Sequence, residues 1–274
     1  MPEIPQTTLN DGVTIPQLGF GTYLIPDDEA PAAVATALGA GYRHIDTASI
    51  YDNERGVGRA LAASGLARDE YFVTTKLWND AHRPSRARVS INASLERLGL
   101  DYVDLYLIHW PATVKYGDAY IEAWDALQEF KREGLTRSIG VSNFNAEHLD
   151  ALRGETPSVD QIELHPRLVQ PGLCAELGRR GVAVEAWSPL GRASVLDEPA
   201  IARIAAELDR TPAQVVIRWH LQRGHIVIPK SVHAGRIAEN IDVFDFTLTD
   251  AQMAAITGLD RAERTGSDPV TAPF

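Results

Sequence analysis

Residues 71–110 read YFVTTKLWNDAHRPSRARVSINASLERLGLDYVDLYLIHW, and this stretch contains one complete strand, helix and strand. The apolar runs at 71–75 and 103–108 have the length and the aromatic and aliphatic character of buried strands. The segment between them, 84–98, has the pattern of a helix. A strand, a helix and a second strand in succession predict two parallel strands joined by a helical crossover.

The same alternation continues along the rest of the chain. We predict further strands at 17–21, 44–46, 138–141, 159–162, 183–187 and 226–228. Helices are predicted at 28–40, 53–64, 117–133, 145–153, 171–180, 198–223, 234–241 and 249–257. The pattern at 198–223 is expected to divide at Thr211-Pro212, where threonine can cap a helix and proline can take its first position. A hairpin with arms at 7–9 and 13–15 precedes the first strand.

Eight repeats of strand and helix are compatible with an open doubly wound α/β sheet or with a closed (β/α)8 TIM barrel. No linker and no change in composition divides the chain, which favours the barrel in a single domain over residues 1–274. The hairpin is expected to close the bottom of the barrel, and an irregular tail at about 262–274 is expected to lie over one face. In such a barrel the catalytic residues lie at the C-terminal ends of the strands.

The composition excludes several classes of protein. A formal net charge of -11 argues against nucleic-acid binding, which needs cations to neutralise phosphates, and a phosphate-bearing ligand must therefore meet a local positive cluster. Cys174 is the single cysteine, so we expect no intrachain disulfide and a reducing compartment. No signal sequence opens the chain, and no apolar run approaches the roughly 20 residues of a membrane span. We expect a cytoplasmic protein without membrane contact.

Lys76 closes an apolar strand and is expected to point toward the barrel mouth. A buried ammonium without a carboxylate is costly, and Asp46, on the neighbouring strand, is the expected partner. Tyr51 follows in the loop after Asp46. Taken singly, Asp46 is typical of a cap or turn and Tyr51 of a packing residue, but together with Lys76 they suggest chemistry.

An ammonium near a phenol stabilises the phenolate and lowers its pKa from the usual value of about 10, which would make Tyr51 a better general acid. Asp46 would hold Lys76 charged and oriented. A neutral His109, at the end of the fourth strand, would place a substrate oxygen beside Tyr51. No side chain supplies hydride, so a site of this kind needs a nicotinamide cofactor.

Other strand ends fit such a cofactor. Trp187 offers a flat face for the nicotinamide ring, although a core aromatic is the alternative. Ser142, Asn143 and Gln161 can hydrogen-bond a carboxamide, although singly they are typical of caps and turns. The segment KSVHAGR at 230–236 places two cations and a hydroxyl at the start of a helix, which favours a phosphate site over a solvated basic turn in a chain of this charge. A Gly-x-Gly-x-x-Gly fingerprint between a strand and a helix is absent, which argues against a Rossmann fold.

The segments around these residues resemble the signatures of the aldo-keto reductase family. The matching segments are GYRHIDTA at 41–48 with Tyr51, LIHWP at 107–111, GVSNF at 140–144 and IPKS at 228–231. The resemblance extends in order from about residue 18 to residue 260. The segment TKLWND at 75–80, together with Trp187, is most similar to the bacterial 2,5-diketo-D-gluconate reductase group.

The resemblance implies an NADPH-dependent reductase of aldehydes and ketones with a catalytic tetrad of Asp46, Tyr51, Lys76 and His109. The implied nicotinamide contacts are Thr22, Ser142, Asn143, Gln161 and Trp187, and the implied pyrophosphate contacts are Ser188, Leu190 and Gly191. The implied contacts of the adenosine 2′-phosphate are Lys230, Ser231 and Arg236, with Glu239 and Asn240 near the adenine, and Val232 is a further implied cofactor contact. Because Lys230 and Arg236 are both present, NADPH is favoured over NADH.

The resemblance also implies an apolar, aromatic substrate pocket formed by Tyr23, Trp78 and Trp110. The loops after the fourth and seventh strands and the C-terminal tail are short compared with animal members of the family. We therefore expect a permissive site for small dicarbonyls, keto-sugars or xenobiotic aldehydes. His233 stands where other members often have Thr or Arg. The family is often monomeric, and a monomer is expected.

Two other functions compete with this one. A non-catalytic NADPH-sensing subunit, like the potassium-channel β subunits of the superfamily, is disfavoured by the complete tetrad. A metal-dependent barrel hydrolase or isomerase would use histidines at the barrel ends, such as His44, His109 and His165. No pair of these has the spacing of a metal site, and Lys76 would repel a cation, so we expect no metal.

Overall fold

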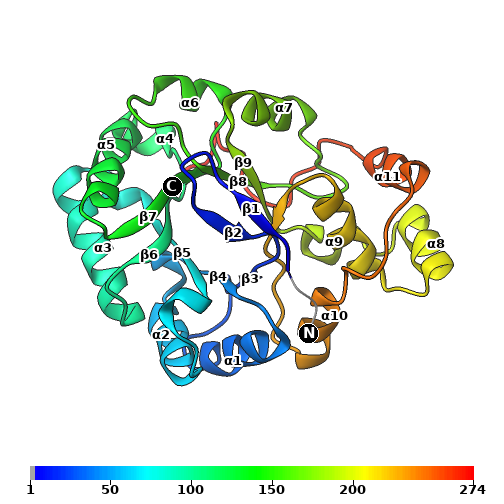
Figure 1. The fold of residues 1–274 in the computed structure, drawn as a ribbon. Helices are drawn as coiled ribbons and strands as arrows, with labels where there is room; N and C mark the ends of the chain where they lie inside the picture. The colour runs from blue at the N-terminus through cyan, green and yellow to red at the C-terminus, as the bar shows by residue number, and fades with distance from the viewer. Residues whose placement is uncertain (1–3) are drawn as a thin grey trace.

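The computed structural model describes residues 4–274, and these form a closed barrel of parallel strands inside a ring of helices (Figure 1). The strands follow one another around the sheet in chain order, each parallel to the next. Their bounds are β3 (Phe20–Gly21), β4 (His44–Asp46), β5 (Phe72–Leu77), β6 (Val103–Ile108), β7 (Thr136–Ser142), β8 (Val159–Glu163), β9 (Ala183–Trp187) and β10 (Ile226–Val227). The predicted (β/α)8 fold is confirmed.

The barrel closes where its first and last strands meet. Leu18 bridges Val227 in parallel, and the Gly19 amide donates to the Val227 carbonyl at 2.8 Å. The Gly21 amide donates to the Pro229 carbonyl at 3.1 Å, so the contact continues to the C-terminal ends of both strands. This closure excludes the open doubly wound sheet, in which the edge strands stay apart.

A hairpin covers the N-terminal end of the barrel, as predicted. Its strands β1 (Gln6–Thr8) and β2 (Thr14–Pro16) pair antiparallel and cross the barrel opening (Figure 1). Leu9 and Ile15 from this hairpin bury their side chains against a cluster that includes Phe72. Because this end of the barrel is filled with apolar side chains, the polar inner residues gather toward the other end.

Helices cover the outside of the sheet. Their bounds are α1 (Ala30–Ala40), α2 (Glu54–Ala63), α3 (Pro84–Leu98), α4 (Thr113–Tyr116), α5 (Ala119–Arg132), α6 (Ala146–Ala151), α7 (Pro171–Arg180), α8 (Pro199–Leu208), α9 (Pro212–Gln222), α10 (Ala234–Ile241) and α11 (Asp250–Thr257). The predicted division of 198–223 is confirmed: Thr211 caps α9, and its hydroxyl accepts a hydrogen bond from the Gln214 amide at 3.2 Å. Within residues 4–274, no helix is long and apolar enough to cross a membrane.

Several element boundaries differ from the predictions. Strand β5 extends two residues beyond the predicted end, so Lys76 lies inside the strand rather than after it. The first core strand is shorter than predicted and contains Phe20–Gly21 alone. The short helix α4 falls in a segment predicted as a loop, because four residues are too few to show a helical period.

Strand residues alternate between the barrel interior and the helix layer. In β5, Val73 belongs to the large core beneath the helices, whereas Phe72 belongs to the inner cluster. The same period of two turns Lys76 inward, where the sheet register sets β5 beside β4 and its Asp46. The fold therefore brings the charged side chains of β4 and β5 together at the C-terminal end of the barrel.

Candidate active site

Lys76 and Asp46 form a buried ion pair. Lys76 Nζ lies 2.7 Å from both carboxylate oxygens of Asp46 and donates a third hydrogen bond to the Thr47 carbonyl at 2.9 Å. Lys76 is fully buried and Asp46 is 2% exposed. All three ammonium protons have acceptors, which a buried lysine needs to stay charged. The predicted pairing of these two residues is present in the structure.

Tyr51 lies at the end of a 3-10 turn, Ser49–Tyr51, directly after β4. The Lys76 Nζ is 5.2 Å from the centre of its ring, and the His109 ring centre is 5.6 Å away. Lys76, with its partner Asp46, and His109 thus lie around the phenol at one end of the barrel.

The expected lowering of the Tyr51 pKa is wrong. Burial first, and then the negative charge of Asp46, raise the pKa of the Tyr51 phenol well above its usual value. The physical reason is that the positive charge of Lys76 is neutralised by Asp46, and that a half-buried phenolate would lose its hydration. Tyr51 is therefore a protonated phenol at neutral pH.

His109 follows β6 and is 7% exposed. Burial, and then the positive charge of Lys76, lower the pKa of His109 well below its usual value, so the imidazole is neutral as predicted. Its Nδ1 has no hydrogen-bond partner among residues 4–274. A neutral imidazole beside Tyr51 can donate or accept one hydrogen bond with a ligand.

Asn143 connects His109 with Trp187. Its backbone is left-handed, with φ of 63°, a conformation that asparagine tolerates better than most residues. The side-chain amide donates to the His109 carbonyl at 2.9 Å and to the Ser142 hydroxyl at 3.0 Å, and it accepts from the Trp187 indole at 2.9 Å. The indole plane is thereby held at the mouth of the barrel, half-buried.

Gln161 holds the side chain of Asp46, and Thr22 holds its backbone. Gln161 Nε2 donates to Asp46 Oδ2 at 2.8 Å. The Thr22 amide and hydroxyl both donate to the Asp46 carbonyl, at 3.0 Å and 2.9 Å. Ser142 donates its hydroxyl to the Gln161 carbonyl at 2.7 Å. These residues form one polar network with the Lys76 pair.

The loop after β9 contains a run of left-handed backbone. Ser188, Gly191 and Arg192 have φ of 47°, 53° and 53°, the last two in a short turn at Gly191–Ala193. Left-handed conformations at non-glycine residues are costly and concentrate at functional sites. Leu190, predicted with Ser188 and Gly191 to contact a pyrophosphate, lies within the same loop.

The cationic segment after β10 is exposed. Lys230, Val232 and Arg236 are solvent-exposed, and within residues 4–274 neither Lys230 nor Arg236 forms an ion pair. Ser231 is buried, and its hydroxyl accepts from the His233 amide at 3.1 Å, at the start of α10. Unpaired cations beside a helix N-terminus are suited to a phosphate group.

Glu239 and Asn240 lie farther along α10. The Glu239 carboxylate accepts a hydrogen bond from the Thr211 hydroxyl at 2.7 Å, which ties α10 to α9. Asn240 is 5% exposed. The structure therefore gives Glu239 a partner within the protein.

Aromatic side chains surround the mouth of the barrel. Tyr23 is 47% exposed, and its ring centre lies 5.1 Å from that of Tyr51. Trp78 and Trp110 both contact Phe274, with ring centres at 5.8 Å and 5.1 Å. The resemblance allows the C-terminal tail to contribute to the pocket, but nothing local in the sequence distinguishes Phe274 from the other tail residues.

The C-terminal tail is fastened to the barrel mouth by Glu163, at the end of β8. The Thr265 amide and hydroxyl both donate to Glu163 Oε1 at 2.6 Å, and the Gly266 amide donates at 3.1 Å. A Cβ added to Gly266 would stand 2.5 Å from the Trp187 ring. The tail therefore packs against the indole, and its expected position over one face is confirmed.

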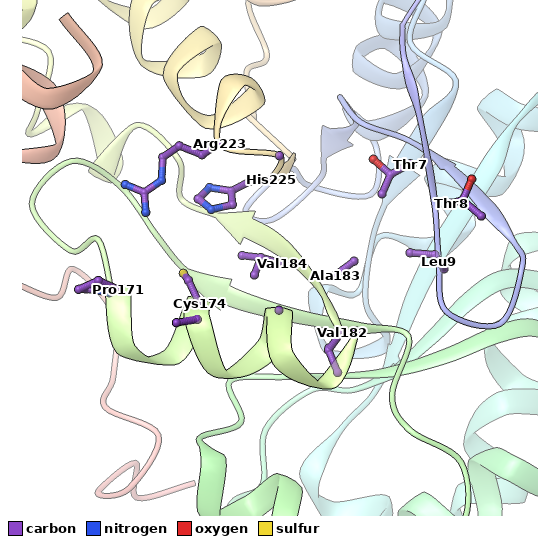
Figure 2. Close-up of a pocket in the computed structure, with 14 residues that line it drawn as sticks. Thr7, Thr8, Leu9, Pro171, Cys174, Val182, Ala183, Val184, Arg223 and His225 are labelled. Atoms are coloured by element: carbon purple, nitrogen blue, oxygen red, sulfur yellow. The ribbon is translucent and has the colours of Figure 1, made fainter. Parts of the chain in front are cut away.

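A cavity of about 640 Å³ lies at the other end of the barrel (Figure 2). It is bounded by the hairpin residues Thr7–Leu9, by Cys174 on α7 and by Arg223 and His225 near β10. None of the predicted site residues lines it. Because barrel chemistry takes place at the C-terminal ends of the strands, this cavity does not belong to the candidate site.

A closed (β/α)8 barrel that buries an ion pair beside a phenol at the C-terminal ends of its strands is typical of a barrel enzyme. The family model of the aldo/keto reductases matches residues 17–261, and the chain belongs to this family of oxidoreductases. Its members reduce carbonyl groups.

Relatives and solved structures match over nearly the whole chain. An aldo-keto reductase of Mycolicibacterium vanbaalenii is 54% identical over 271 residues, covering 98% of this chain and 96% of the relative. A methylglyoxal reductase, DkgA, of Yersinia pestis is 52% identical, covering 97% and 96%. A mutant of Gox0644 solved in complex with NADPH has a TM-score of 0.95 and 44% identity, and each chain is covered completely.

Proposed function

We propose that this protein reduces small aldehydes and ketones to alcohols with NADPH, and that Tyr51 donates the proton. The observation that carries this proposal is the cluster of Tyr51, His109 and the Lys76–Asp46 pair at the C-terminal end of the barrel. A carbonyl oxygen that becomes an alkoxide needs a proton, and only a protonated group can give one.

Each residue of the cluster has a separate part in the proposal. Neutral His109 hydrogen-bonds the carbonyl oxygen and directs it toward Tyr51. The high pKa of Tyr51 keeps the phenol loaded with its proton. As the proton leaves, negative charge develops on the phenol, and the ammonium 5.2 Å from the ring centre stabilises it. Asp46 keeps Lys76 charged and in place.

The residues of the site fit NADPH, which supplies a hydride when bound. Trp187, held by Asn143, offers its indole face to the nicotinamide, and Thr22, Ser142 and Gln161 stand around the same end of the barrel. The left-handed loop with Ser188, Leu190 and Gly191 is proposed to hold the pyrophosphate. Lys230, Ser231 and Arg236 would hold the 2′-phosphate, Val232 would contact the cofactor beside them, and Glu239 and Asn240 would lie near the adenine. Support comes from the NADPH complex of Gox0644.

Small dicarbonyls such as methylglyoxal are the substrates we favour, with keto-sugars and xenobiotic aldehydes as wider candidates. The similarity to a methylglyoxal reductase supports this choice. The mouth is bounded by Tyr23, Trp78, Trp110 and Phe274, which leave an aromatic surface for a small acceptor. A bulky or strongly charged acceptor would meet little polar surface there.

The test is the consumption of NADPH by the purified protein with a panel of aldehydes, dicarbonyls and keto-sugars, and with NADH in parallel. Turnover that favours NADPH and methylglyoxal supports the proposal. Tight NADPH binding without turnover of any carbonyl would instead support a sensor. We also propose that the protein is a monomer and is cytoplasmic. Light scattering of the purified protein measures its oligomeric state.

A further inference from the structure

A second acid lies inside the barrel below the Lys76–Asp46 pair. Glu185, in the middle of β9, is fully buried, and its register neighbours are Gln161 on β8 and Ile226 on β10. The roles proposed above leave it without a function. A buried carboxyl is costly, so its presence in the barrel interior needs a reason.

Glu185 is joined to Asp46 by one side chain. Gln161 Nε2 donates to Asp46 Oδ2 at 2.8 Å and to Glu185 Oε2 at 3.0 Å. Both protons of the amide are therefore used by the two acids. The reverse orientation would set the amide oxygen against the Asp46 carboxylate, so Asp46 determines which way Gln161 points, and Glu185 holds that orientation by accepting the second amide proton.

Polar and titratable groups surround Glu185 from three strands. His44 and Asp46 face it from β4, Lys76 from β5 and Gln161 from β8, and His44 Nε2 lies 3.7 Å from Glu185 Oε1. Burial, and then the charge of Asp46, raise the pKa of Glu185 to about 8. Burial lowers the pKa of His44 to about 3, so its ring is neutral. At neutral pH the interior thus carries one carboxylate for one ammonium.

We propose that Glu185 is a positioning residue for carbonyl reduction, acting through the Gln161 amide to keep Asp46 turned toward Lys76. This inference rests on the proposed function, because its effect reaches the reaction at Tyr51. Lys76 can stabilise charge on the phenol only while Asp46 holds it in place. A fixed Gln161 also keeps its amide oxygen directed away from the two acids.

The charge of Glu185 has a second consequence. When this acid loses its proton, its negative charge raises the pKa of Tyr51 and makes the phenol a weaker acid. Reduction by the natural protein should therefore slow as the pH rises through about 8. Glu185→Gln keeps an acceptor for Gln161 but cannot ionise, so this loss of rate should be absent in the variant.

The first experiment measures kcat for methylglyoxal with saturating NADPH from about pH 6 to about pH 10. We expect an inflection near pH 8 in the natural protein and none in Glu185→Gln, with kcat at neutral pH within about threefold of the natural value. Asp104→Asn is the matched control, because Asp104 is equally buried on β6 but pairs with Arg68 and Arg137. The control should lose stability and keep the natural pH profile.

The second experiment tests the path through Gln161 with Glu185→Leu, Gln161→Leu and the double variant. Each single change is expected to lower kcat about tenfold, and the double variant should lose no more than Gln161→Leu alone. Losses that multiply would overturn the path through Gln161. If Glu185→Leu does not fold, the profile of Glu185→Gln decides alone.

A natural pH profile in Glu185→Gln, with only the melting temperature changed, would show that Glu185 is merely structural. Tyr51→Phe assayed alongside separates this failure from that of the proposed function. Turnover retained by Tyr51→Phe contradicts the proton donor itself, whereas an inactive Tyr51→Phe beside an unchanged Glu185→Gln overturns the role of Glu185 alone.

Discussion

Lys76 shows at the scale of a residue how one side chain depends on its neighbours. Its ammonium is fully buried, and it stays charged because Asp46 and the Thr47 carbonyl accept all three protons. Tyr51 is the opposite case, because burial and the negative charge of Asp46 make its phenolate costly and keep the phenol protonated. In the proposed reaction the proton donor is therefore a phenol whose developing negative charge is stabilised by Lys76.

Tyr51→Phe removes the proposed proton donor and leaves the ring in place. We expect kcat to fall by about 10²- to 10⁴-fold, the usual contribution of general acid catalysis. NADPH should still bind, because the ring packs as before. Steady-state rates and a fluorescence titration with NADPH measure the two effects, and activity close to natural would contradict the assignment.

Lys76→Met should lose nearly as much activity, and it should also lose stability. Removing one member of a buried ion pair costs about 3–5 kcal/mol, because Asp46 is left as an uncompensated charge. The double variant Lys76→Met with Asp46→Asn should recover part of the stability and none of the activity. Urea unfolding and kcat measure this contrast, and a double variant as unstable as Lys76→Met would argue against the pair.

At the scale of elements, strand ends, the loop after β9 and the tail meet in one place. The tail is held by Glu163 at the end of β8, and it packs on Trp187 at the end of β9. The segment that leads from β10 toward α10 passes beside β3, because barrel closure carries the Lys230 Cβ to within 3.7 Å of a Cβ placed on Gly21. Segments far apart in the chain therefore bound a single site.

Gly266→Ala tests whether the tail positions the Trp187 indole. The added methyl would stand 2.5 Å from the ring, so either the tail or the indole must move. Overpacking typically costs about 1–3 kcal/mol, and we expect NADPH binding to weaken roughly tenfold. Gly178→Ala, which meets open space on α7, is the control that should bind NADPH normally.

Arg236→Ala tests the cationic start of α10. A lost charge-assisted hydrogen bond to a phosphate costs about 1.5–3 kcal/mol, so the Kd of NADPH should rise roughly tenfold or more while that of NADH stays nearly constant. Lys230→Ala should behave alike. Arg203→Ala removes an exposed arginine that pairs with Glu207 on α8 and serves as the control. Equal losses for both cofactors would contradict a 2′-phosphate site.

At the scale of the whole molecule, burial sets how stability depends on pH. Six imidazoles have a lowered pKa, in each case first through burial: His44, His82, His109, His148, His220 and His225. Below about pH 6.5 these groups bind protons when the protein unfolds. Their contribution to the free energy of unfolding is therefore present above about pH 6.5 and is lost as the pH falls. Asp160 and Glu185, with raised pKa values, act in the opposite direction above about pH 4, and for Glu185 this loss of stability continues up to about pH 8. The imidazoles outnumber them, and acid should destabilise the fold.

His82→Phe tests this account at one residue. Burial lowers the pKa of His82 to about 4, and neither ring nitrogen has a partner within residues 4–274. The variant should lose less stability between about pH 6.5 and about pH 5 than the natural protein, by roughly 1 kcal/mol per pH unit. Urea unfolding at both pH values measures the slope. The exposed His233→Gln is the control, and an unchanged slope in His82→Phe would contradict the account.

The alternation of strands and helices and the residues at the strand ends could be predicted from the sequence, because both depend on local patterns. The period of two in β5 marks Lys76 as inward-facing, and the order of strands places Asp46 beside it. The capped start of α9 at Thr211 is equally local. For the same reason the cationic segment before α10 could be predicted from the sequence, whereas the proposed tetrad also depended on the resemblance to a family.

The contacts across the barrel could not be predicted from the sequence, because they depend on the folded arrangement of the strands. Closure through Leu18 and Val227, the packing of Phe274 on Trp110, and the approach of Glu185 to Asp46 all join strands or segments far apart in the chain. The raised pKa of Tyr51 belongs with these, since it depends on burial and on charges from other strands. Local patterns show which way a side chain points, whereas register and closure decide what it meets there.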